Sequence, residues 1–435
     1  MAARDASALY DRPPMDRALP NALGLLPEAF ADACASTLGW PRGRGLRVYS
    51  EIFRHGEART GPRDAPKVFH ASPIIRELRE SCEEGEVIKF LTRVPVDPAA
   101  SPIGSAAPNA VHPGAIPGTG TTSSVADRFP HLDIESVLIP MVGRKGVLSY
   151  TLCVSSQVGC AMGCTFCETA QMGLIRSLTP AEIVGQWFNA RHIVGKEVNN
   201  IVFMGMGEPL DNYDNVIAAI AILKDHLAAA VPTSKITIST VGRVDGIEKL
   251  KIKILESGWH RLGIALSLNA PSDAVRDQIM PINRKWTLAE LQTSLLAWPK
   301  FGGNKISFEY VLIPGVNDSD EHAAMVGEFY APFRAQHPRG LPEAGGATPR
   351  ALVNLIPYNP RRESPWPAPT EERIERFMEL LSAAGVYVKR RRTKGRKMMG
   401  ACGQLGTAEI RRRQIVGQMA GQPAGQPVGL TIAGQ

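Results

Sequence analysis

The segment from Val147 to Cys167, VLSYTLCVSSQVGCAMGCTFC, joins an apolar run to three closely spaced cysteines. The apolar run, Val147 to Val154, predicts a β-strand. Cys160, Cys164 and Cys167 follow in one loop, with three and then two residues between them. Three thiolates in one loop can converge on a soft metal centre. The segment therefore predicts a strand that carries a metal-binding loop near its carboxyl end.

Beyond this loop, strand-like runs alternate with helical patterns. We predict strands at 147–154, 200–204, 235–239, 262–268, 306–313, 352–356 and 386–389, and helices at 180–194, 214–227, 245–255, 288–296, 321–333 and 371–384. Nearly continuous apolar strands separated by helices indicate a parallel sheet covered by helices. Repeated right-handed crossovers curl such a sheet toward a barrel. The predicted fold class is therefore α/β, a partial (β/α)6 barrel with its chemistry at the carboxyl ends of the strands.

The rest of the chain divides by composition. Amphipathic runs around Leu46 to Phe53, and Ile74, Ile75 and Leu78 at helical spacing, predict a small helical N-terminal domain over 22–94. Residues 95–130 are rich in Pro, Gly and Ser and predict a disordered insertion. We expect the barrel over 131–392, a basic loop over 393–413, and disordered ends at 1–21 and 414–435.

The overall composition excludes several classes of protein. Of the 435 residues, 44% are hydrophobic and 21% charged, which is typical of a soluble globular protein and excludes a disordered or fibrous chain. No apolar run approaches the roughly 18 residues of a membrane span. The first twenty residues lack the basic and apolar regions of a secretory signal. We expect a cytoplasmic monomer that does not bind membranes.

The positive charge is concentrated near the C-terminus. The net charge is +7, and residues 386–413 hold ten basic residues against the single acidic Glu409. The remaining chain is therefore slightly acidic. A basic cluster of this kind indicates a polyanionic partner such as nucleic acid. A solvated basic segment without a specific partner is the alternative.

The seven cysteines indicate a metal or redox site rather than a disulfide framework, since no signal for secretion is seen. Three cysteine ligands on a four-iron cluster leave one iron open for chemistry. The alternative is a zinc site with Cys153 as a fourth ligand. Its spacing of six, three and two residues fits no common zinc pattern.

The three-cysteine loop after the first strand of a βα barrel resembles the radical S-adenosylmethionine (SAM) enzymes. Further motifs closely resemble the RlmN/Cfr family, the radical SAM adenine methyltransferases of ribosomal and transfer RNA. They are Thr151-Leu-Cys153-Val-Ser-Ser-Gln-Val-Gly-Cys160, Thr169-Ala-Gln171, Gly205-Met-Gly-Glu-Pro209 and Ala401-Cys402-Gly-Gln-Leu405. The resemblance covers 135–405 strongly and 45–93 weakly.

The resemblance implies a 4Fe–4S cluster bound by Cys160, Cys164 and Cys167, and two SAM molecules per turnover. The open iron would bind the amino and carboxylate groups of SAM. By the same resemblance, the SAM contacts are Gly207, Glu208, Ser239, Ser267, Leu268, Asn269 and Asn359. Asn269 stands where we associate a His with close relatives. For each polar contact, a turn or strand cap is the structural alternative. The family also implies a flavodoxin-like electron donor.

The resemblance further assigns three residues to the chemistry. Cys402 would accept a methyl group from a first SAM, and a radical from a second SAM would remove hydrogen from that methyl group. The carbon would then join the adenine ring in a transient protein–RNA crosslink. Glu135 would take the ring proton, and Cys153 would attack the Cys402 sulfur, form a disulfide and release the product. Buried or solvated side chains without a catalytic role are the alternative.

The implied function is methylation of carbon 2 of adenosine in 23S rRNA at the peptidyl-transferase centre, with the tRNA adenosine 3′ of the anticodon as a second target. Pro209 and the Thr169-Ala-Gln171 triplet favour this branch. A carbon-8 (Cfr-type) methyltransferase is one alternative, and a non-catalytic, metal-stabilised RNA-binding protein is another. Residues 393–400 are basic where relatives carry acidic residues, which changes the charge beside Cys402.

Overall fold

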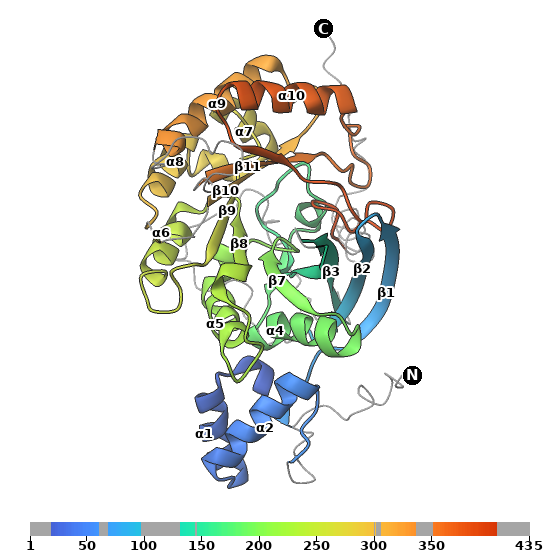
Figure 1. Cartoon of the computed structure of the whole chain (residues 1–435), viewed down its shortest axis with the longest axis vertical. Coiled ribbons are helices and arrows are strands. Elements are labelled where there is room, and N and C mark those ends of the chain that lie inside the picture. The colour runs from blue at the N-terminus through green and yellow to red at the C-terminus, as the bar shows by residue number, and fades with distance from the viewer. Residues whose placement is uncertain are drawn as a thin grey trace, which may run out of the picture.

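One ten-stranded sheet organises the molecule. The computed structural model in Figure 1 describes residues 19–60, 68–96, 131–143, 146–299, 301, 306–335 and 351–406. The strand order is β1-β2-β3-β4-β7-β8-β9-β10-β11-β12. The strands are β1 (Ile74–Cys82), β2 (Gly85–Val94), β3 (Leu132–Val142), β4 (Leu148–Cys153), β7 (Val198–Phe203), β8 (Ile236–Thr240), β9 (Gly263–Ser267), β10 (Ile306–Leu312), β11 (Ala351–Pro357) and β12 (Val388–Arg390). Strands β1 to β4 pair antiparallel, whereas β4 to β12 pair parallel.

Helices follow the parallel strands in regular alternation. They are α4 (Pro180–Phe188), α5 (Tyr213–Lys224), α6 (Val244–Lys253), α7 (Asp273–Ile279), α8 (Leu288–Leu296), α9 (Asp320–Ala335) and α10 (Glu371–Ala383). Single turns complete the chain at η2 (Ala22–Gly24), η4 (Thr169–Met172), η5 (Asn189–Ile193), η6 (Pro209–Asn212), η7 (Thr233–Lys235) and η8 (Pro281–Arg284). The helices lie along the outer side of the curved sheet (Figure 1). A small sheet of β5 (Gln157–Gly159) and β6 (Leu174–Ser177) lies beside the cysteine loop.

The predicted α/β fold class is confirmed. The strands and helices predicted over 147–389 overlap observed elements, because parallel strands buried on both faces are apolar along their whole length. In the described residues β1 and β12 are the two ends of the strand order and do not pair with each other, so the barrel is partial.

The helical prediction for 22–94 is wrong in its second half. Helices α1 (Pro27–Leu38) and α2 (Arg42–His55) form as expected, but residues 74–94 form the hairpin β1–β2. This hairpin pairs with β3 and so extends the main sheet. The error has a geometric cause. Ile74 and Leu78 are four residues apart, and four residues place two side chains on one face of a strand as well as of a helix.

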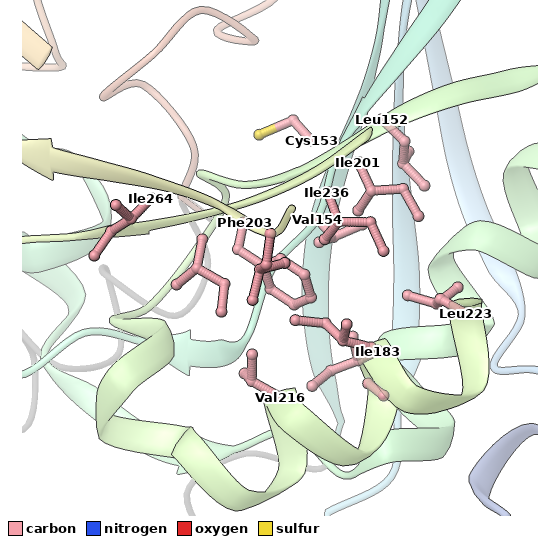
Figure 2. Packing of buried hydrophobic residues seen from close by; sticks show 14 of the residues in the cluster. Leu152, Cys153, Val154, Ile183, Ile201, Phe203, Val216, Leu223, Ile236 and Ile264 are labelled. Carbon is pink, nitrogen blue, oxygen red and sulfur yellow. The ribbon is translucent and has the colours of Figure 1, made fainter. Parts of the chain in front are cut away.

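The Cys153 side chain points away from the core that lies between the sheet and its helices. In Figure 2 the side chains of Leu152 and Val154 face Ile183 of α4, whereas the Cys153 sulfur points to the opposite side of the strand. This alternation follows from the pleat of a β-strand. Leu152, Val154 and Ile183 are at most 1% exposed. Packing of this core therefore turns Cys153 toward the inside of the partial barrel.

Helix α2 packs against α4 and the turn η5 that follows it. The rings of Phe53 and Trp187 stack with centroids 5.9 Å apart, and His192 Nε2 lies 2.9 Å from the Phe53 carbonyl oxygen. The predicted terminal segments and insertion, apart from residues 19–21, 95 and 96, lie outside the described residues, and so does the basic run Arg411–Arg413. No helix in the described part is long and apolar enough to cross a membrane.

Candidate active site

The three cysteines lie in a buried loop between β5 and η4. Cys160 and Cys164 are 8% and 6% exposed, and Cys167 is half-buried. The Cys160 N–H donates to the Gly173 carbonyl oxygen at 2.9 Å, which closes the loop against β6. Burial raises the pKa of all three thiols because a thiolate loses its hydration there. Thiolates at these positions therefore require a compensating cation.

The donor set fits an iron–sulfur cluster. In the described residues, no three His, Cys, Asp or Glu side chains converge on a point where one metal ion could sit. A four-iron cluster does not require such convergence, because each cysteine binds a different iron. Three thiols in one short loop match the soft ligands of that cluster. The geometry therefore disfavours the zinc alternative.

A buried guanidinium organises the loops around the cysteines. Arg276 is fully buried and donates hydrogen bonds to the carbonyl oxygens of Val241, Ser267 and Leu268. Burial lowers its pKa to about 10, and the neighbouring Cys164 opposes this shift. Arg276 thus ties the ends of β8 and β9 together and places positive charge beside the cysteine loop.

A cavity of about 150 Å³ opens at the carboxyl ends of the parallel strands. It brings Cys164 and Cys167 together with five of the seven predicted SAM contacts. Those five are Gly207, Glu208, Ser239, Ser267 and Asn269. Residues from β7, β8, β9 and β10 therefore meet where the parallel topology places the end of each strand.

Backbone N–H groups hold the side chains of two predicted SAM contacts in this cavity, Glu208 and Asn269. Glu208 is 2% exposed, and its carboxylate accepts from the N–H groups of Leu210 at 3.1 Å and Val241 at 2.9 Å. Burial raises the Glu208 pKa. Asn269 has a φ of 53° and accepts from the Val311 N–H at 2.9 Å. Asparagine is one of the few residues that adopts this left-handed conformation readily, which suits it to this position.

The structure separates two predicted contacts from the cavity. The Leu268 side chain is 1% exposed in the core, and its carbonyl oxygen is bound by Arg276. Asn359 lines a second cavity instead. Its Oδ1 is buried and has no hydrogen-bond partner among the described residues, so it is available to a ligand.

The second cavity brings together the two cysteines to which the resemblance assigns the chemistry, Cys153 and Cys402. Its volume is about 550 Å³, and Cys153 and Cys402 both line it although they lie 249 residues apart in sequence. Cys402 lines the smaller cavity as well. Six basic side chains line the larger cavity, against the single acidic side chain of Glu84: Lys235, Lys389, Arg390, Arg391, Arg392 and Lys394. Cys402 therefore lies where the two cavities adjoin.

The cysteines are reduced in this structure. All seven are free, so the expected disulfide between Cys153 and Cys402 is not supported. Burial and the neighbouring Cys402 raise the pKa of Cys153 to about 12. Burial also raises the pKa of Cys402, and the positive charge of Arg391 opposes that shift.

Residues 391–406, here called the Cys402 loop, bind the segment that follows the cluster cysteines. The Glu168 N–H donates to the Gly403 carbonyl oxygen at 2.8 Å, and Thr169 Oγ1 donates to the Leu405 carbonyl oxygen at 2.5 Å. Both bonds are made by residues that follow Cys402 in the loop. They position the Cys402 sulfur relative to the cysteine loop.

Glu135 supports the same loop. It lies within β3, is 3% exposed, and lines neither cavity. Its Oε2 accepts from the Gly406 N–H at 2.9 Å and lies 2.8 Å from Lys89 Nζ. Lys89 in turn donates to the Met399 carbonyl oxygen at 2.9 Å. In this arrangement the predicted base anchors the loop that carries Cys402.

Two polar residues near Cys402 were not predicted. Arg391 Nε lies 3.4 Å from Glu309 Oε2 in β10, and Arg391 lines the larger cavity together with Cys402. A single acid within the apolar run ISFEYVLI was the available signal for Glu309. Arg391 was hidden within the basic cluster, where we expected contacts to a polyanion.

Much of that basic cluster is neutralised within the chain. Four of its members form ion pairs: Arg390 with Glu371, Arg391 with Glu309, Arg392 with Glu83, and Lys394 with Glu84. Their distances range from 2.5 to 3.4 Å. The positive charge available to a polyanion is therefore smaller than the sequence count suggests.

Known proteins resemble the chain across this site. The sequence profile of the radical SAM superfamily matches residues 154–326, which include the three cysteines. The probable dual-specificity RNA methyltransferase RlmN 1 of Protochlamydia amoebophila is 42% identical over 283 residues, 65% of this chain and 72% of that protein. The chain belongs to the RlmN family. An RlmN from Phenylobacterium zucineum is 39% identical over 295 residues, 66% of this chain and 70% of its own.

A solved structure extends the RlmN-family likeness to the fold. The radical SAM methyltransferase from Sphaerobacter thermophilus is 31% identical, with a TM-score of 0.69 over 89% of this chain and 99% of its own. Membership of the RlmN family, within the radical SAM superfamily, identifies the chain as a SAM-dependent methyltransferase and implies a 4Fe–4S cluster and SAM.

Proposed function

We propose that this chain methylates carbon 2 of adenosine in 23S rRNA, with the tRNA adenosine 3′ of the anticodon as a second target. One observation carries the proposal: Cys402 lines both cavities, and Cys153 lines only the larger one. A thiol at such a boundary can receive a group on one side and deliver it on the other. A larger cavity of about 550 Å³ is in the size range of small-ligand sites.

The smaller cavity is proposed to bind the cofactors. Cys160, Cys164 and Cys167 would hold the cluster, and Glu208 offers a buried carboxylate to the amino group of SAM. When bound, SAM and the cluster would supply the methyl group and the radical that removes a hydrogen atom from it. Glu208, Ser239 and Ser267 would orient SAM, and the buried site would exclude water.

The larger cavity is proposed to admit the adenine base. Cys402 would carry the methyl carbon to the ring, and Cys153 would then attack the Cys402 sulfur to release the product. Glu135 would accept the ring proton once the Gly406 N–H and Lys89 no longer occupy its carboxylate. The six Lys and Arg side chains of the cavity support an RNA substrate, because Lys and Arg neutralise phosphates, although four of them also pair with acids of the chain. By resemblance, helices α1 and α2 would contribute to holding the RNA.

The test begins with anaerobic purification and iron and sulfide analysis. The holoenzyme is then incubated with SAM, a reductant and ribosomal RNA from cells that lack their own carbon-2 methyltransferase. Mass spectrometry of the digested RNA should detect 2-methyladenosine, with Cys402→Ala as the inactive control and Cys82→Ala as a matched active one. The 8-methyl isomer would move the chain to the carbon-8 branch. A bound cluster with no methylated base would contradict the proposal, and zinc in place of iron would contradict its radical chemistry.

A further inference from the structure

Two consecutive arginines reach the cysteine loop from the segment that follows β11. Arg361 Nε donates to the Thr165 carbonyl oxygen at 2.8 Å, and Thr165 lies two residues before Cys167. Arg362 binds the residue on the other side of Cys167. Its backbone N–H and its Nη1 each donate to the Glu168 carboxylate at 3.1 Å. The two arginines therefore hold the chain on both sides of a predicted cluster ligand.

The contacts of Arg362 extend to the Cys402 loop. Its Nη1 also donates to the Gly406 carbonyl oxygen at 3.1 Å. Glu168 is 1% exposed, so its carboxylate must be paired, and Arg362 supplies the opposite charge. The Glu168 backbone N–H in turn donates to the Gly403 carbonyl oxygen. The ion pair of Glu168 and Arg362 is neutral as a whole and joins three segments: the cysteine loop, the segment after β11 and the Cys402 loop.

Arg361 differs from Arg362 in its charge balance. Its guanidinium donates to two carbonyl oxygens, those of Thr165 and Arg362, and forms no ion pair within the part of the chain that the structure describes. The side chain is half-buried, so solvent screens its charge less than it would at the surface. Arg361 therefore leaves a net positive charge beside the cysteine loop.

A positive charge beside this loop favours an additional electron on a bound cluster. A four-iron cluster held by three thiolates is negatively charged, and reduction makes it more so. Net charge and hydrogen bonds near a cluster are among the factors that set its reduction potential. The attraction between unlike charges is also stronger in a partly buried site than in water. The charge of Arg361 therefore makes the cluster easier to reduce.

We propose that Arg361 and Arg362 clamp the cysteine loop on both sides of Cys167, and that Arg361 raises the reduction potential of the cluster bound there. Arg362, neutralised by Glu168, acts through position and holds the Cys402 loop against the cysteine loop. This inference rests on the part of the proposed function that places a four-iron cluster on the three cysteines. The reduction adds one electron, supplied by the reductant, and no bond forms or breaks. Both arginines are positioning residues, because each bonds to the loop that carries the ligands.

The first test separates the charge of Arg361 from its hydrogen bonds. Cluster-loaded protein is titrated anaerobically with dithionite and redox mediators, and electron paramagnetic resonance measures the reduced cluster. Arg361→Gln keeps an N–H donor for the Thr165 carbonyl oxygen but removes the charge. We expect it to lower the equilibrium constant for reduction about tenfold, which corresponds to a potential about 59 mV lower. Arg361→Lys keeps the charge and should retain most of the wild-type potential.

Arg376→Met is the control for the loss of an arginine elsewhere, because Arg376 pairs with Asp320 and lines neither cavity. Its cluster should have the wild-type potential. Equal potentials in Arg361→Gln and Arg376→Met would overturn the electrostatic role of Arg361. A potential as low in Arg361→Lys as in Arg361→Gln would overturn it as well, since the charge would then not be the cause.

The second test separates the position that Arg362 sets from its charge. The double variant Glu168→Gln/Arg362→Met removes both charges, so its reduction potential should stay close to the wild-type value. Amide hydrogen exchange in peptides that cover residues 401–406 should be about fivefold faster, which is the effect of losing one net hydrogen bond. This readout does not depend on catalysis. Unchanged exchange in these peptides would overturn the role of Arg362 in holding the Cys402 loop.

Iron and sulfide analysis tests the proposed function separately. Wild-type protein that binds no four-iron cluster, or Cys164→Ala protein that binds one as fully as wild type, would overturn the placement of the cluster on the three cysteines. A fully loaded cluster whose potential does not respond to Arg361 would overturn the present inference and leave the proposed function intact.

Discussion

The Glu135 carboxylate lies 2.8 Å from the Lys89 ammonium group, and both side chains are at most 4% exposed. The two residues lie on neighbouring strands, β3 and β2. Glu135 holds the Gly406 N–H, and Lys89 holds the Met399 carbonyl oxygen. One buried ion pair therefore fixes the Cys402 loop on both sides of the cysteine.

Removing one partner of this pair should destabilise the protein strongly. Lys89→Met leaves a buried carboxylate without its cation, which costs about 3–5 kcal/mol. The double variant Lys89→Met/Glu135→Gln should recover much of that loss, since no unpaired charge remains. Chemical denaturation of the four proteins measures the cycle. Additive losses in the double variant would show that the two groups are not coupled.

Replacing either cysteine of the larger cavity with alanine should stop the methylation reaction, but at different steps. Cys402→Ala should retain full iron content and abolish RNA methylation, because it removes the proposed methyl carrier. Cys153→Ala should retain the first methyl transfer but accumulate covalent protein–RNA adduct, because the resolving thiol is absent. Gel electrophoresis with labelled RNA detects the adduct. Multiple-turnover methylation by either variant would contradict these roles, and Cys82→Ala controls for the loss of a thiol elsewhere.

Gly207 should not tolerate a side chain. Its φ is +100°, and an added Cβ would lie 2.5 Å from Gln157 Cβ, so Gly207→Ala must displace the turn that carries Glu208. We expect at least tenfold weaker SAM binding by calorimetry, equivalent to about 1.4 kcal/mol. Gly195→Ala is the matched control, because Gly195 has a φ of +76° with nothing within 4 Å of the added Cβ. Equal SAM affinity in the two variants would refute the steric argument.

Acid should weaken the attachment of the N-terminal helices. Burial lowers the pKa of His192 to about 4, from 6.5, so the folded protein keeps this imidazole neutral where the unfolded chain protonates it. Stability from this group is full above pH 6.5 and falls as the pH drops toward 4, by on the order of 1 to 2 kcal/mol. Melting temperatures of wild type and His192→Gln across this range measure the effect. The variant should lose part of the pH slope; an identical slope would exclude His192 as its source.

Local sequence signals predicted the barrel and the cysteine loop well. The parallel strands can be recognised from their own apolar residues, and the three cysteines are close together in the sequence. The β1–β2 hairpin was missed because the spacing of Ile74 and Leu78 suits both helix and strand. An exposed edge strand also lacks the apolar continuity that marked β7 to β11.

Contacts between distant segments were not predictable from local patterns. The placement of Cys153 beside Cys402 came from the family resemblance, since nothing near either residue encodes the other. The pairing of Glu309 with Arg391 and the anchoring of Gly406 by Glu135 required the folded sheet. Asn359 follows the end of β11, as predicted, but it lines the larger cavity rather than the smaller one.

The Cys402 loop connects the two ends of the strand order. Arg392 pairs with Glu83, Lys394 pairs with Glu84, and the Lys397 N–H bonds to Glu80, all at the β1–β2 hairpin. These contacts are among the longest-range in sequence that the described residues make, and contacts of long range carry the larger entropic cost of closure. During synthesis, the cysteine loop and its surrounding strand ends emerge well before residues 391–406. The order of synthesis therefore allows the cluster site to assemble while the Cys402 thiol is still absent from it.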